Sequence, residues 1–452
     1  MGQLRFAEAQ VQAAIARSWD SKSWENSPPS TRTKHMLFNR DRALDYMRRC
    51  NLDALVATSP VNITYFSGYY SWLGDQFKEY MVKPGGSGDL LPSFALFPGQ
   101  GDPALVIDAI LASNAMDVWV RDLRLFGGDS FDHTPPSQAL TDRQQEIFEL
   151  MAATPYAPTA VDALASLLKD KNLATARIGI EWQDLPLTLR TAIEAALPAA
   201  QFKDCSNLIR LIRMVKSTEE LKLLTQAAAI SEEAAALSLA QAQPGRSMLE
   251  LADHFRITLA ARGADLDHFA FSPKGLGIGT EMDYHLTADD ALYVDYGCVY
   301  KYCGSDSGLT LALSPLSDDL AHKYDALRQC IEAGQQAMRP GAKASSVPEA
   351  MWEVLRHHGI SASFPHGHGV GLEVRDYPIL VADTGLRVQD DCVDEPADLP
   401  IEKDMMLNLE AMIFIPGTAS LHIEQSFVVG DDGGTLLTPQ ERQHPFYPGE
   451  SS

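Results

Sequence analysis

Acidic side chains stand inside apolar, strand-like segments in the last third of this 452-residue sequence. An unpaired charge in such a segment is costly to bury, so each acid needs a partner or a cation. The second acid follows the first by 11 positions and the fourth follows the third by 14, spacings that fit two hairpins and would bring all four carboxylates to one point. One such acid is more often an exposed residue or an ion-pair partner, but four together predict a binding site. They are Asp295 in ALYVDYG, Asp306 in YCGSDSG, Glu410 in MMLNLEAMIF and Glu424 in LHIEQSFVV.

An imidazole adds to these carboxylates. His368 lies in PHGHGVG, where the glycines allow a close approach of the backbone. Four carboxylates and one imidazole suit two divalent ions bridged by water or hydroxide, which can generate hydroxide at neutral pH and polarise a carbonyl. Carboxylate-rich ligation favours Mn²⁺, Co²⁺ or Fe²⁺ over a thiolate-type zinc site. We therefore predict two divalent metal ions, Mn²⁺ first, with Co²⁺, Fe²⁺ or Zn²⁺ as alternatives.

Helical and strand-like segments alternate from residue 36 to about residue 205, which predicts a first α/β domain. A long helix with an acidic first turn is expected in MVKSTEELKLLTQAA, followed by short strands and further helices. The acidic, proline-punctuated stretch 389–404 is expected to be a surface loop. We predict an α/β (α+β) chain with a helical packing or dimer arm at residues 1–35, an N-terminal domain at 36–212 and a second domain at 213–452.

The charge balance excludes several classes of partner. With 60 acidic against 37 basic residues, the formal net charge is −23, and neither nucleic acid nor an anionic membrane is an expected partner. No apolar run approaches the roughly 18 residues of a spanning helix, and the first residues do not resemble a signal peptide. Six cysteines at irregular spacings make no disulfide framework, so the expected location is the reducing cytoplasm.

At its motifs the chain resembles the pita-bread metallopeptidases, the family of prolidase, aminopeptidase P, methionine aminopeptidase and creatinase. The matching motifs are VDYG…SD, HGVGLEV and LE…IEQSFVV, with MVKSTEELKLLTQAA and NITYFSGY before them. The resemblance implies a creatinase-type N-terminal α/β domain, a pita-bread catalytic domain of antiparallel sheet covered by helices, and a homodimer. It also implies that the metal ligands are Asp295, Asp306, His368, Glu410 and Glu424.

The activity that the resemblance implies is cleavage of an Xaa-Pro bond, or of another small peptide or amide bond, by a metal-bridging hydroxide. Glu410 would be ligand and general base at once. His285 in EMDYHLT would donate a proton to the departing nitrogen or stabilise the oxyanion. The family's proton-donating histidine precedes the first aspartate by a longer gap than this chain has. An exposed loop position for His285 is therefore an equal alternative, and His268 in LDHFAFSP is a second candidate.

Two departures from the prolidase pattern concern the substrate. Arg375 stands seven residues after His368, where prolidase-like members carry a histidine, and His422 stands two residues before Glu424, where they usually carry an arginine. The two changes read either as an exchange that keeps one guanidinium and one imidazole over the metals or as independent changes. A guanidinium can hold a carboxylate with two hydrogen bonds, whereas an imidazole suits proton transfer. We expect Arg375 and His422 to orient a small substrate with an anionic group.

Three further residues are candidates for binding the substrate. In a strand, His366 would share a face with His368, so that it either meets the substrate or packs in the core. Tyr70 and Trp72 belong to an aromatic loop, GYYSWLGDQFKEY. This loop either covers the active site as a lid or packs in the core. In related enzymes this part of the N-terminal domain can reach the active site of a neighbouring subunit.

Other functions remain open on the same scaffold. A metal-dependent lyase that acts on dimethylsulfoniopropionate shares the fold, and Asp376 beside Arg375 is the residue here that would serve as its base. That lyase carries an additional aspartate two positions after the first ligand, where this chain has Gly297. The scaffold also suits a creatinase-like, metal-free C–N hydrolase and a non-catalytic binding protein. Release of acrylate without uptake of water would identify the lyase.

Overall fold

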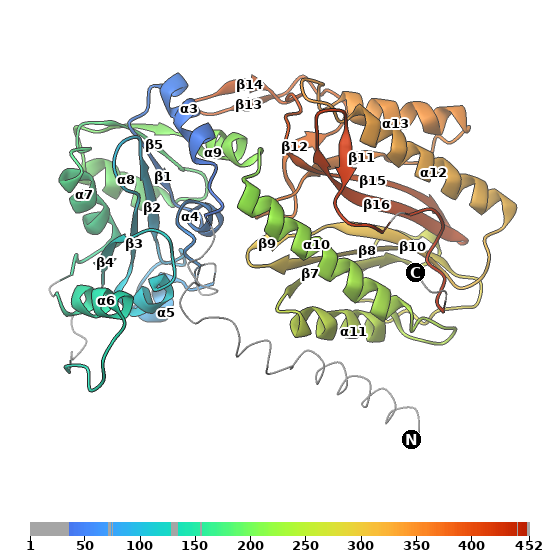
Figure 1. The fold of residues 1–452 in the computed structure, drawn as a ribbon, viewed down its shortest axis with the longest axis horizontal. Coiled ribbons are helices and arrows are strands. Elements are labelled where there is room, and N and C mark those ends of the chain that lie inside the picture. Colours follow the sequence, from blue (N-terminus) through green and yellow to red (C-terminus); the bar gives the residue numbers. More distant parts are fainter. Residues whose placement is uncertain are drawn as a thin grey trace. The chain divides into compact units, whose positions relative to one another are not determined.

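The computed structural model describes residues 36–70, 74, 76–127, 134–153, 156–440 and 442–449. The predicted arm at residues 1–35 lies outside the described residues, and so does Trp72. The described chain forms two compact units (Figure 1): one runs to Glu220 and includes Leu386–Ala397, and the other comprises Leu221–Gly385 and the residues from Asp398 onward. The division falls between residues 220 and 221 rather than between 212 and 213.

The first unit contains a six-stranded mixed sheet in the order β4-β3-β2-β1-β5-β6. Its central strand β1 is a short apolar run whose four residues are all buried, as expected for a strand covered on both faces. The strands are β1 (Ala54–Ala57), β2 (Phe94–Pro98), β3 (Ala104–Asp108), β4 (Asp122–Phe126), β5 (Arg177–Ile180) and β6 (Gln201–Asp204). The helices are α3 (Arg40–Cys50), α4 (Pro60–Ser67), α5 (Glu79–Val82), η1 (Ala109–Ala115), α6 (Asp142–Ala152), α7 (Ala160–Asp170), α8 (Leu187–Ala196) and α9 (Ser206–Arg213).

A two-stranded ribbon from the second half of the sequence belongs to the first unit. It consists of β13 (Arg387–Gln389) and β14 (Asp394–Pro396), which pair antiparallel. Asp390 Oδ2, between these strands, accepts a hydrogen bond from the backbone N–H of Leu208 over 2.9 Å. It thus satisfies a donor in the first turn of α9, whose N-cap residue provides no such bond. The acidic stretch predicted to be a loop therefore contains a strand and a helix cap.

The second unit contains a nine-stranded antiparallel sheet in the order β12-β11-β15-β16-β10-β8-β7, with β17 beside β16 and β9 beside β8. Helix α11 packs against β7, α12 against β15 and β16, and α13 against β11. The strands are β7 (Asp265–Ser272), β8 (Ala291–Tyr300), β9 (Cys303–Gly304), β10 (Ser307–Ala312), β11 (His366–Gly369), β12 (Asp376–Leu380), β15 (Met406–Ile415), β16 (Ala419–Val429) and β17 (Gly434–Leu436). The helices are α10 (Thr218–Leu239), α11 (Met248–Ala261), η2 (Pro273–Gly275), α12 (Asp318–Ala337) and α13 (Ser346–His357).

Both predicted hairpins are present in this sheet. Strands β8 and β10 pair antiparallel with Asp295 opposite Gly308, and β15 and β16 pair with Glu410 opposite Glu424. In the turn of the second hairpin Gly417 adopts a φ of 78°, a left-handed conformation that glycine reaches without steric cost. The predicted architecture, an α/β domain followed by an antiparallel sheet covered by helices, is confirmed.

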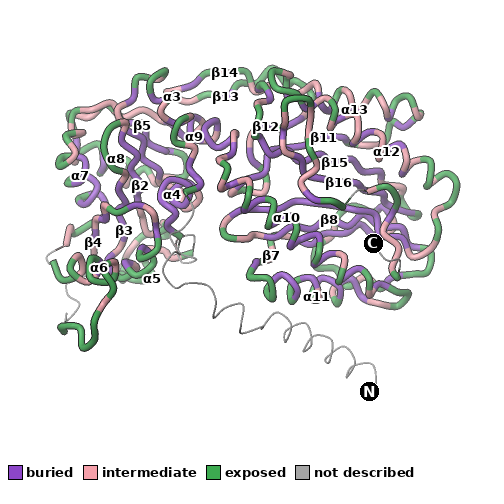
Figure 2. Tube along the Cα trace, viewed as in Figure 1, coloured by how far each residue is buried: buried purple, intermediate pink, exposed green. Residues whose placement is uncertain are grey.

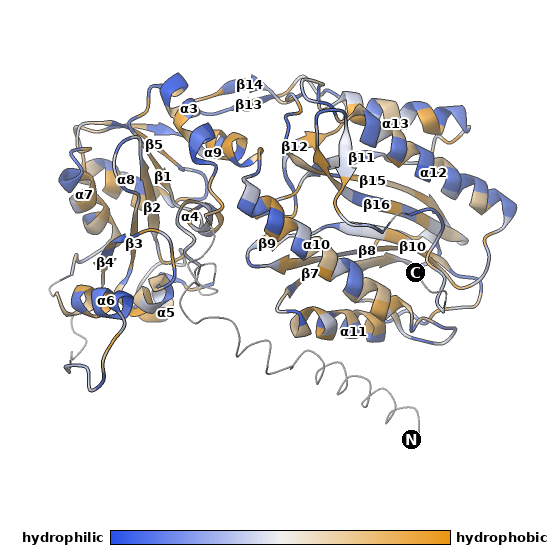
Figure 3. Cartoon of the chain, in the orientation of Figure 1, coloured by the Kyte–Doolittle hydropathy of each residue, from blue (hydrophilic) through white to orange (hydrophobic). Residues whose placement is uncertain are grey.

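Hydrophobic residues of the strands and of the inward helix faces form a core in each unit (Figures 2 and 3). In the part of the chain that the structure describes, no helix combines the length and the apolar character needed to cross a membrane.

Candidate metal centre

Acidic residues form a row across the middle strands of the second sheet. Glu410 on β15 lies opposite Glu424 on β16, Glu424 lies opposite Gly308 on β10, and Gly308 lies opposite Asp295 on β8. Side chains of residues that face each other on adjacent strands project from the same side of the sheet, so the three carboxylates converge. Because like charges in this position destabilise a sheet, the row calls for a positive partner.

Asp306 and His368 complete the predicted set of five. Asp306, immediately before β10, is 7% exposed, and His368 on β11 is fully buried. Asp306 Oδ2 lies 3.3 Å from His368 Nε2. One ligand atom from each of Asp306, His368 and Glu424 lies within 4.8 Å of the other two. The fold thus brings together five residues that are spread over 130 positions of the sequence.

Two more histidines extend this cluster into three converging groups. Each group combines one imidazole with two carboxylates, and Asp306 and Glu424 each belong to two groups. The groups are His268–Asp295–Asp306, Asp306–His368–Glu424 and Glu410–His422–Glu424.

The donor atoms of the cluster fit a pair of divalent ions. Within the described chain, His368 Nε2, His422 Nε2 and Glu424 Oε2 are buried and have no hydrogen-bond partner. A buried polar atom without a partner is costly, and these nitrogen and oxygen atoms are ligands that divalent transition metals accept. A cation between them would satisfy all three atoms.

The pKa of Glu424 reflects the crowding of charge. Burial, reinforced by three neighbouring carboxylates, raises the pKa of Glu424 well above its usual range. Burial raises the pKa of Asp306, but the contact with His268 and the nearby imidazole of His368 outweigh burial and hold the pKa of Asp306 at about 2. Glu424 is therefore the carboxyl group of the cluster that most readily takes up a proton when no cation is bound.

His268 lies directly at the cluster. It stands on β7 opposite Gly297 of β8, and its Nε2 lies 2.8 Å from Asp295 Oδ1 and 3.4 Å from Asp306 Oδ1. Its Nδ1 lies 2.7 Å from Asp267 Oδ2. Burial lowers the pKa of His268, but hydrogen bonds with these three aspartates outweigh that effect and raise the pKa to about 12.

His285, the predicted proton donor, is not brought to the cluster. Its side chain is 62% exposed, its Nε2 lies 3.5 Å from Asp283, and its Nδ1 lies 3.1 Å from the carbonyl oxygen of Gly245. The prediction followed the family resemblance, although the gap from His285 to Asp295 is shorter than in the family. The register between β7 and β8 instead brings His268 to that carboxylate, and no local sequence pattern reports this register.

Arg375 and His366 meet at one oxygen of Glu410. Arg375 Nη2 lies 2.9 Å and His366 Nε2 lies 2.6 Å from Glu410 Oε1, and the two nitrogens are 2.9 Å apart. Burial raises the pKa of Glu410, but the hydrogen bond with His366 and the nearby imidazole of His422 outweigh burial and lower the pKa. The Arg375 side chain is 52% exposed, so the guanidinium lies at the open side of the cluster.

His422 lies on the other side of Glu410. Its Nε2 is 3.8 Å from Glu410 Oε2 and 3.6 Å from Glu424 Oε2, and its side chain is fully buried. The predicted exchange partners, Arg375 and His422, thus contact the same carboxylate from opposite oxygens.

Two residues that the sequence argument missed fix the orientation of the carboxylates. The hydroxyl of Tyr293 donates to Asp295 Oδ2 over 2.8 Å, and Asn408 Nδ2 donates to Glu424 Oε1 over 2.7 Å. Tyr293 precedes Asp295 by two positions, and Asn408 precedes Glu410 by two. The period of two that puts such neighbours on one face of a strand was therefore a usable signal.

Two glycines make room for the additional histidines. A Cβ atom on Gly297 would lie 2.5 Å from His268 Cε1, and one on Gly308 would lie 2.2 Å from His422 Cε1. Each glycine follows a cluster aspartate by two positions, in Asp295-Tyr-Gly and Asp306-Ser-Gly. The additional aspartate of the lyase has no space at Gly297.

Two other candidates are Asp376 and Tyr70. The Asp376 carboxylate accepts a hydrogen bond from the backbone N–H of Tyr377 over 2.9 Å and belongs to none of the three converging groups. Tyr70 follows α4 in the first unit and is 41% exposed.

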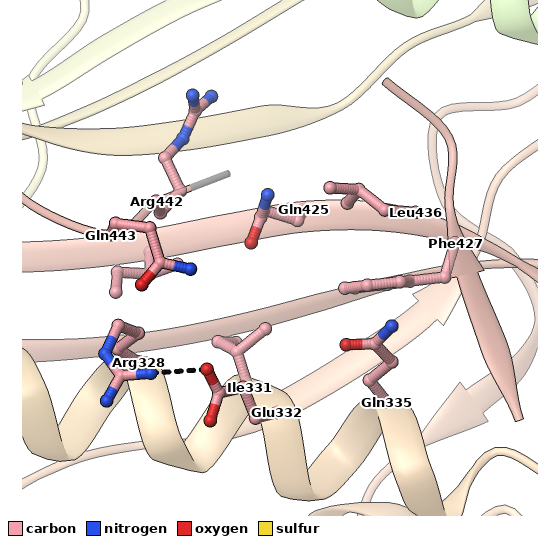
Figure 4. A pocket seen from close by; sticks show the side chains of 10 residues that line it. Arg328, Ile331, Glu332, Gln335, Gln425, Phe427, Leu436, Arg442 and Gln443 are labelled. Atoms are coloured by element: carbon pink, nitrogen blue, oxygen red, sulfur yellow. Dashed lines mark hydrogen bonds and ion pairs between the residues drawn. The ribbon is translucent and has the colours of Figure 1, made fainter. Parts of the chain in front are cut away.

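A cavity of about 140 Å³ lies on the opposite face of the second sheet (Figure 4). It faces the odd-numbered residues of β16, whereas His422 and Glu424 project from the other face. Its arginines are paired, Arg328 with Asp325 and Glu332, and Arg442 with Glu232. The lining residues include Arg328, Glu332, Gln335, Gln425, Phe427, Arg442 and Gln443.

Comparison with known proteins agrees with this geometry. Residues 222–431 match the model of metallopeptidase family M24, and residues 133–215 match that of the creatinase/prolidase N-terminal domain. An Xaa-Pro dipeptidase of Pyrococcus furiosus is 23% identical over 250 residues, which cover 54% of this chain and 68% of that protein. An uncharacterized peptidase of Bacillus subtilis is 26% identical over 275 residues, 59% of this chain and 74% of that protein.

Solved structures share the fold. An Xaa-Pro dipeptidase from Bacillus anthracis aligns with a TM-score of 0.66 at 19% identity, over 88% of this chain and 96% of that one. An X-Pro aminopeptidase from Thermotoga maritima aligns with a TM-score of 0.66 at 19% identity, over 88% of this chain and 99% of that one.

Proposed function

We propose that this protein hydrolyses a small peptide or amide that carries a carboxylate group. Its carboxylate-bearing unit belongs to metallopeptidase family M24, and the protein is accordingly a metal-dependent hydrolase of the peptidase class. Convergence of Asp295, Asp306, His368, Glu410 and Glu424 on one face of the sheet is the observation that carries the proposal. Two divalent ions, when bound there, would supply polarisation of a carbonyl group and acidification of water.

Glu410 is the proposed general base. It lies at the edge of the cluster, where Arg375 and His366 hold its Oε1 atom in place. A carboxylate whose pKa is lowered stays ionised at neutral pH and can accept the proton of an attacking water molecule.

His268, rather than His285, is the proposed proton donor. Its Nε2 lies between Asp295 and Asp306, and Asp267 fixes the ring through Nδ1. A proton held on Nε2 is placed to reach the departing nitrogen of a substrate bound at the cluster.

Arg375 is the proposed substrate anchor. Its Nη2 is engaged by Glu410 and His366, whereas its Nη1 and Nε form no hydrogen bond with any described residue. A half-exposed guanidinium with free donors can hold a carboxylate with two hydrogen bonds. The proposed substrates are therefore dipeptides or small amides with a free carboxylate, and Xaa-Pro dipeptides, which the names of two relatives indicate, come first. Mn²⁺ as the metal, a homodimer and a cytoplasmic location stay predictions from the sequence.

No described feature favours the lyase. Asp376 lies outside the converging groups, and Gly297 has no space for the additional ligand.

The proposal is tested by measuring metal content and Xaa-Pro dipeptide hydrolysis together, after dialysis and reloading with Mn²⁺. Wild type should hold about two metals per chain and cleave, whereas Glu410→Ala should lose cleavage by roughly 10²–10⁴-fold or more. Glu349→Ala on the exposed side of α13 is the matched control. Metal binding without cleavage of any carboxylate-bearing amide, or release of acrylate, would contradict the hydrolase, and absence of tight metal would contradict the metal centre.

A further inference from the structure

We propose that His422 is itself a metal ligand, which adds a second imidazole to the Glu410–Glu424 end of the centre. The inference rests on the proposed metal-dependent function and goes beyond the five ligands that the family resemblance implies. The Nε2 atom of His422 shares a converging group with one oxygen of each glutamate.

The hydrogen bonds of His422 define which ring nitrogen faces the cluster without a proton. Its Nδ1 lies 3.3 Å from the carbonyl oxygen of Val294 and can only donate to it, so that in the neutral ring the lone pair is on Nε2. That lone pair is buried, has no hydrogen-bond partner among the described residues, and faces carboxylate oxygens at 3.6 and 3.8 Å. These distances are too long for hydrogen bonds, and a buried nitrogen that faces two carboxyl groups without a hydrogen bond is unfavourable unless a cation lies between them.

His368 shows the same arrangement. Its Nδ1 donates to the carbonyl oxygen of Gly369 over 3.0 Å, and its Nε2 is buried without a partner in the described chain, 3.3 Å from Asp306. A metal-ligating histidine generally donates its other N–H to a backbone carbonyl or a carboxylate, which fixes the ring. His422 therefore has the hydrogen bonding of a ligand.

The surroundings of His422 hold the ring in this orientation. The ring stacks on Tyr293 with centroids 3.9 Å apart, and Tyr293 in turn holds Asp295. Any side chain at Gly308 would fill the space that the imidazole occupies. A ring confined on both sides cannot swing out to a substrate, so proton transfer to a substrate is a poor fit for His422.

A second imidazole changes the metal preference of the centre. Carboxylates suit Mn²⁺, whereas imidazoles suit Zn²⁺, Fe²⁺ and Ni²⁺. The end that contains His368 and His422 should therefore prefer Zn²⁺ or Fe²⁺ to Mn²⁺.

The test uses the full-length protein loaded with Co²⁺, whose paramagnetism shifts the exchangeable N–H protons of ligating imidazoles far outside the normal ¹H NMR range. Spectra are compared for wild type, His368→Ala and His422→Asn, with His357→Ala on the exposed side of α13 as the control. Asparagine retains a donor for Val294 but lacks the Nε2 lone pair. X-ray absorption of the Zn²⁺-loaded wild type counts imidazoles per metal without any variant.

We expect His422→Asn to lose one shifted N–H signal, to retain that of His368, and to bind the metal at this end roughly 10–100-fold more weakly. An unchanged signal set in His422→Asn, or an imidazole count in wild type that His368 alone explains, would overturn the assignment while leaving the metal centre intact. If wild type takes up no Co²⁺, the proposed function fails first, and the assignment fails with it. Should His422→Asn fold poorly, the imidazole count decides.

Discussion

At the scale of single residues, the cluster is organised by side chains that neutralise or hold its four carboxylates. His268 is the residue whose role differs most from the sequence argument, because it bonds Asp295 where His285 was expected. We predict that His268→Gln lowers kcat by roughly 10²–10³-fold and leaves metal content near that of wild type, since a proton donor is lost. His285→Gln, at an exposed site, is the comparison, and steady-state kinetics with metal analysis is the measurement. A larger loss in His285→Gln than in His268→Gln would reverse the assignment.

Glu424 gives a second prediction at this scale, for the metal-free protein. A carboxyl whose pKa is raised on folding stabilises the fold below its unfolded-state pKa of about 4.3, and this contribution is lost as the pH rises through the folded-state value. In EDTA at neutral pH, Glu424→Gln should therefore raise the free energy of unfolding by on the order of 1–3 kcal/mol. The same variant should lose tight metal binding. Urea unfolding from pH 4 to 8, with Glu349→Gln as control, measures the effect, and a less stable apo variant at pH 7 would refute it.

At the scale of elements, helix α13 of the second unit depends on a group that is distant in sequence. The N-cap residue of α13, Ser345, makes no capping bond with its own side chain, and Asp398 takes over that role. Asp398 Oδ1 accepts from the N–H of Ser345 over 2.8 Å, and its Oδ2 accepts from the Ser345 hydroxyl over 3.0 Å. Burial raises the pKa of Asp398, but these hydrogen bonds and Lys343 outweigh it, so that the pKa is lowered.

Replacement of this cap should weaken the fold in a pH-dependent way. We predict that Asp398→Ala lowers the free energy of unfolding by about 1 kcal/mol at neutral pH. A carboxylate with a lowered pKa contributes above its unfolded-state pKa of about 3.9, and the contribution is lost as the pH falls through the folded-state value. The difference between variant and wild type should thus disappear towards pH 3. Asp432→Ala at an exposed position is the control, and a pH-independent difference would show that the charge is not responsible.

A contact could be predicted from the sequence only where its residues lie close together along the chain or form a recognisable pattern. Asp295 and Glu410 were found because an acid in an apolar strand is conspicuous and the spacing fits a hairpin. The contact of His268 with Asp295 spans 27 positions and depends on the register of β7 and β8. The cap of α13 by Asp398 spans 53 positions. Rules for helix caps consider only residues next to the helix and therefore do not predict it.

At the scale of the whole molecule, the net charge of −23 repels an approaching anion, although Arg375 is proposed to bind a carboxylate. Two divalent ions would leave the protein strongly negative, so an anionic substrate is repelled at long range and held only at short range. We predict that kcat/KM for an N-acylated amino acid, whose only charge is its carboxylate, rises as ionic strength increases from about 0.01 to 0.15 M, because the Debye length falls from about 30 to about 8 Å. The uncharged amide of the same substrate should show little change. A fall in kcat/KM with salt for the carboxylate substrate would contradict the argument.

The ribbon at Leu386–Ala397 has a topological consequence. Because this segment belongs to the first unit while the residues before and after it belong to the second, the chain from residue 36 onward passes between the units three times. A single proteolytic nick between residues 220 and 221 would leave two intact covalent links. A gene fragment that starts at residue 221 would encode the ribbon without the helix that it caps. Expressing the two units separately would therefore require excision of the ribbon and a new junction between residues 385 and 398.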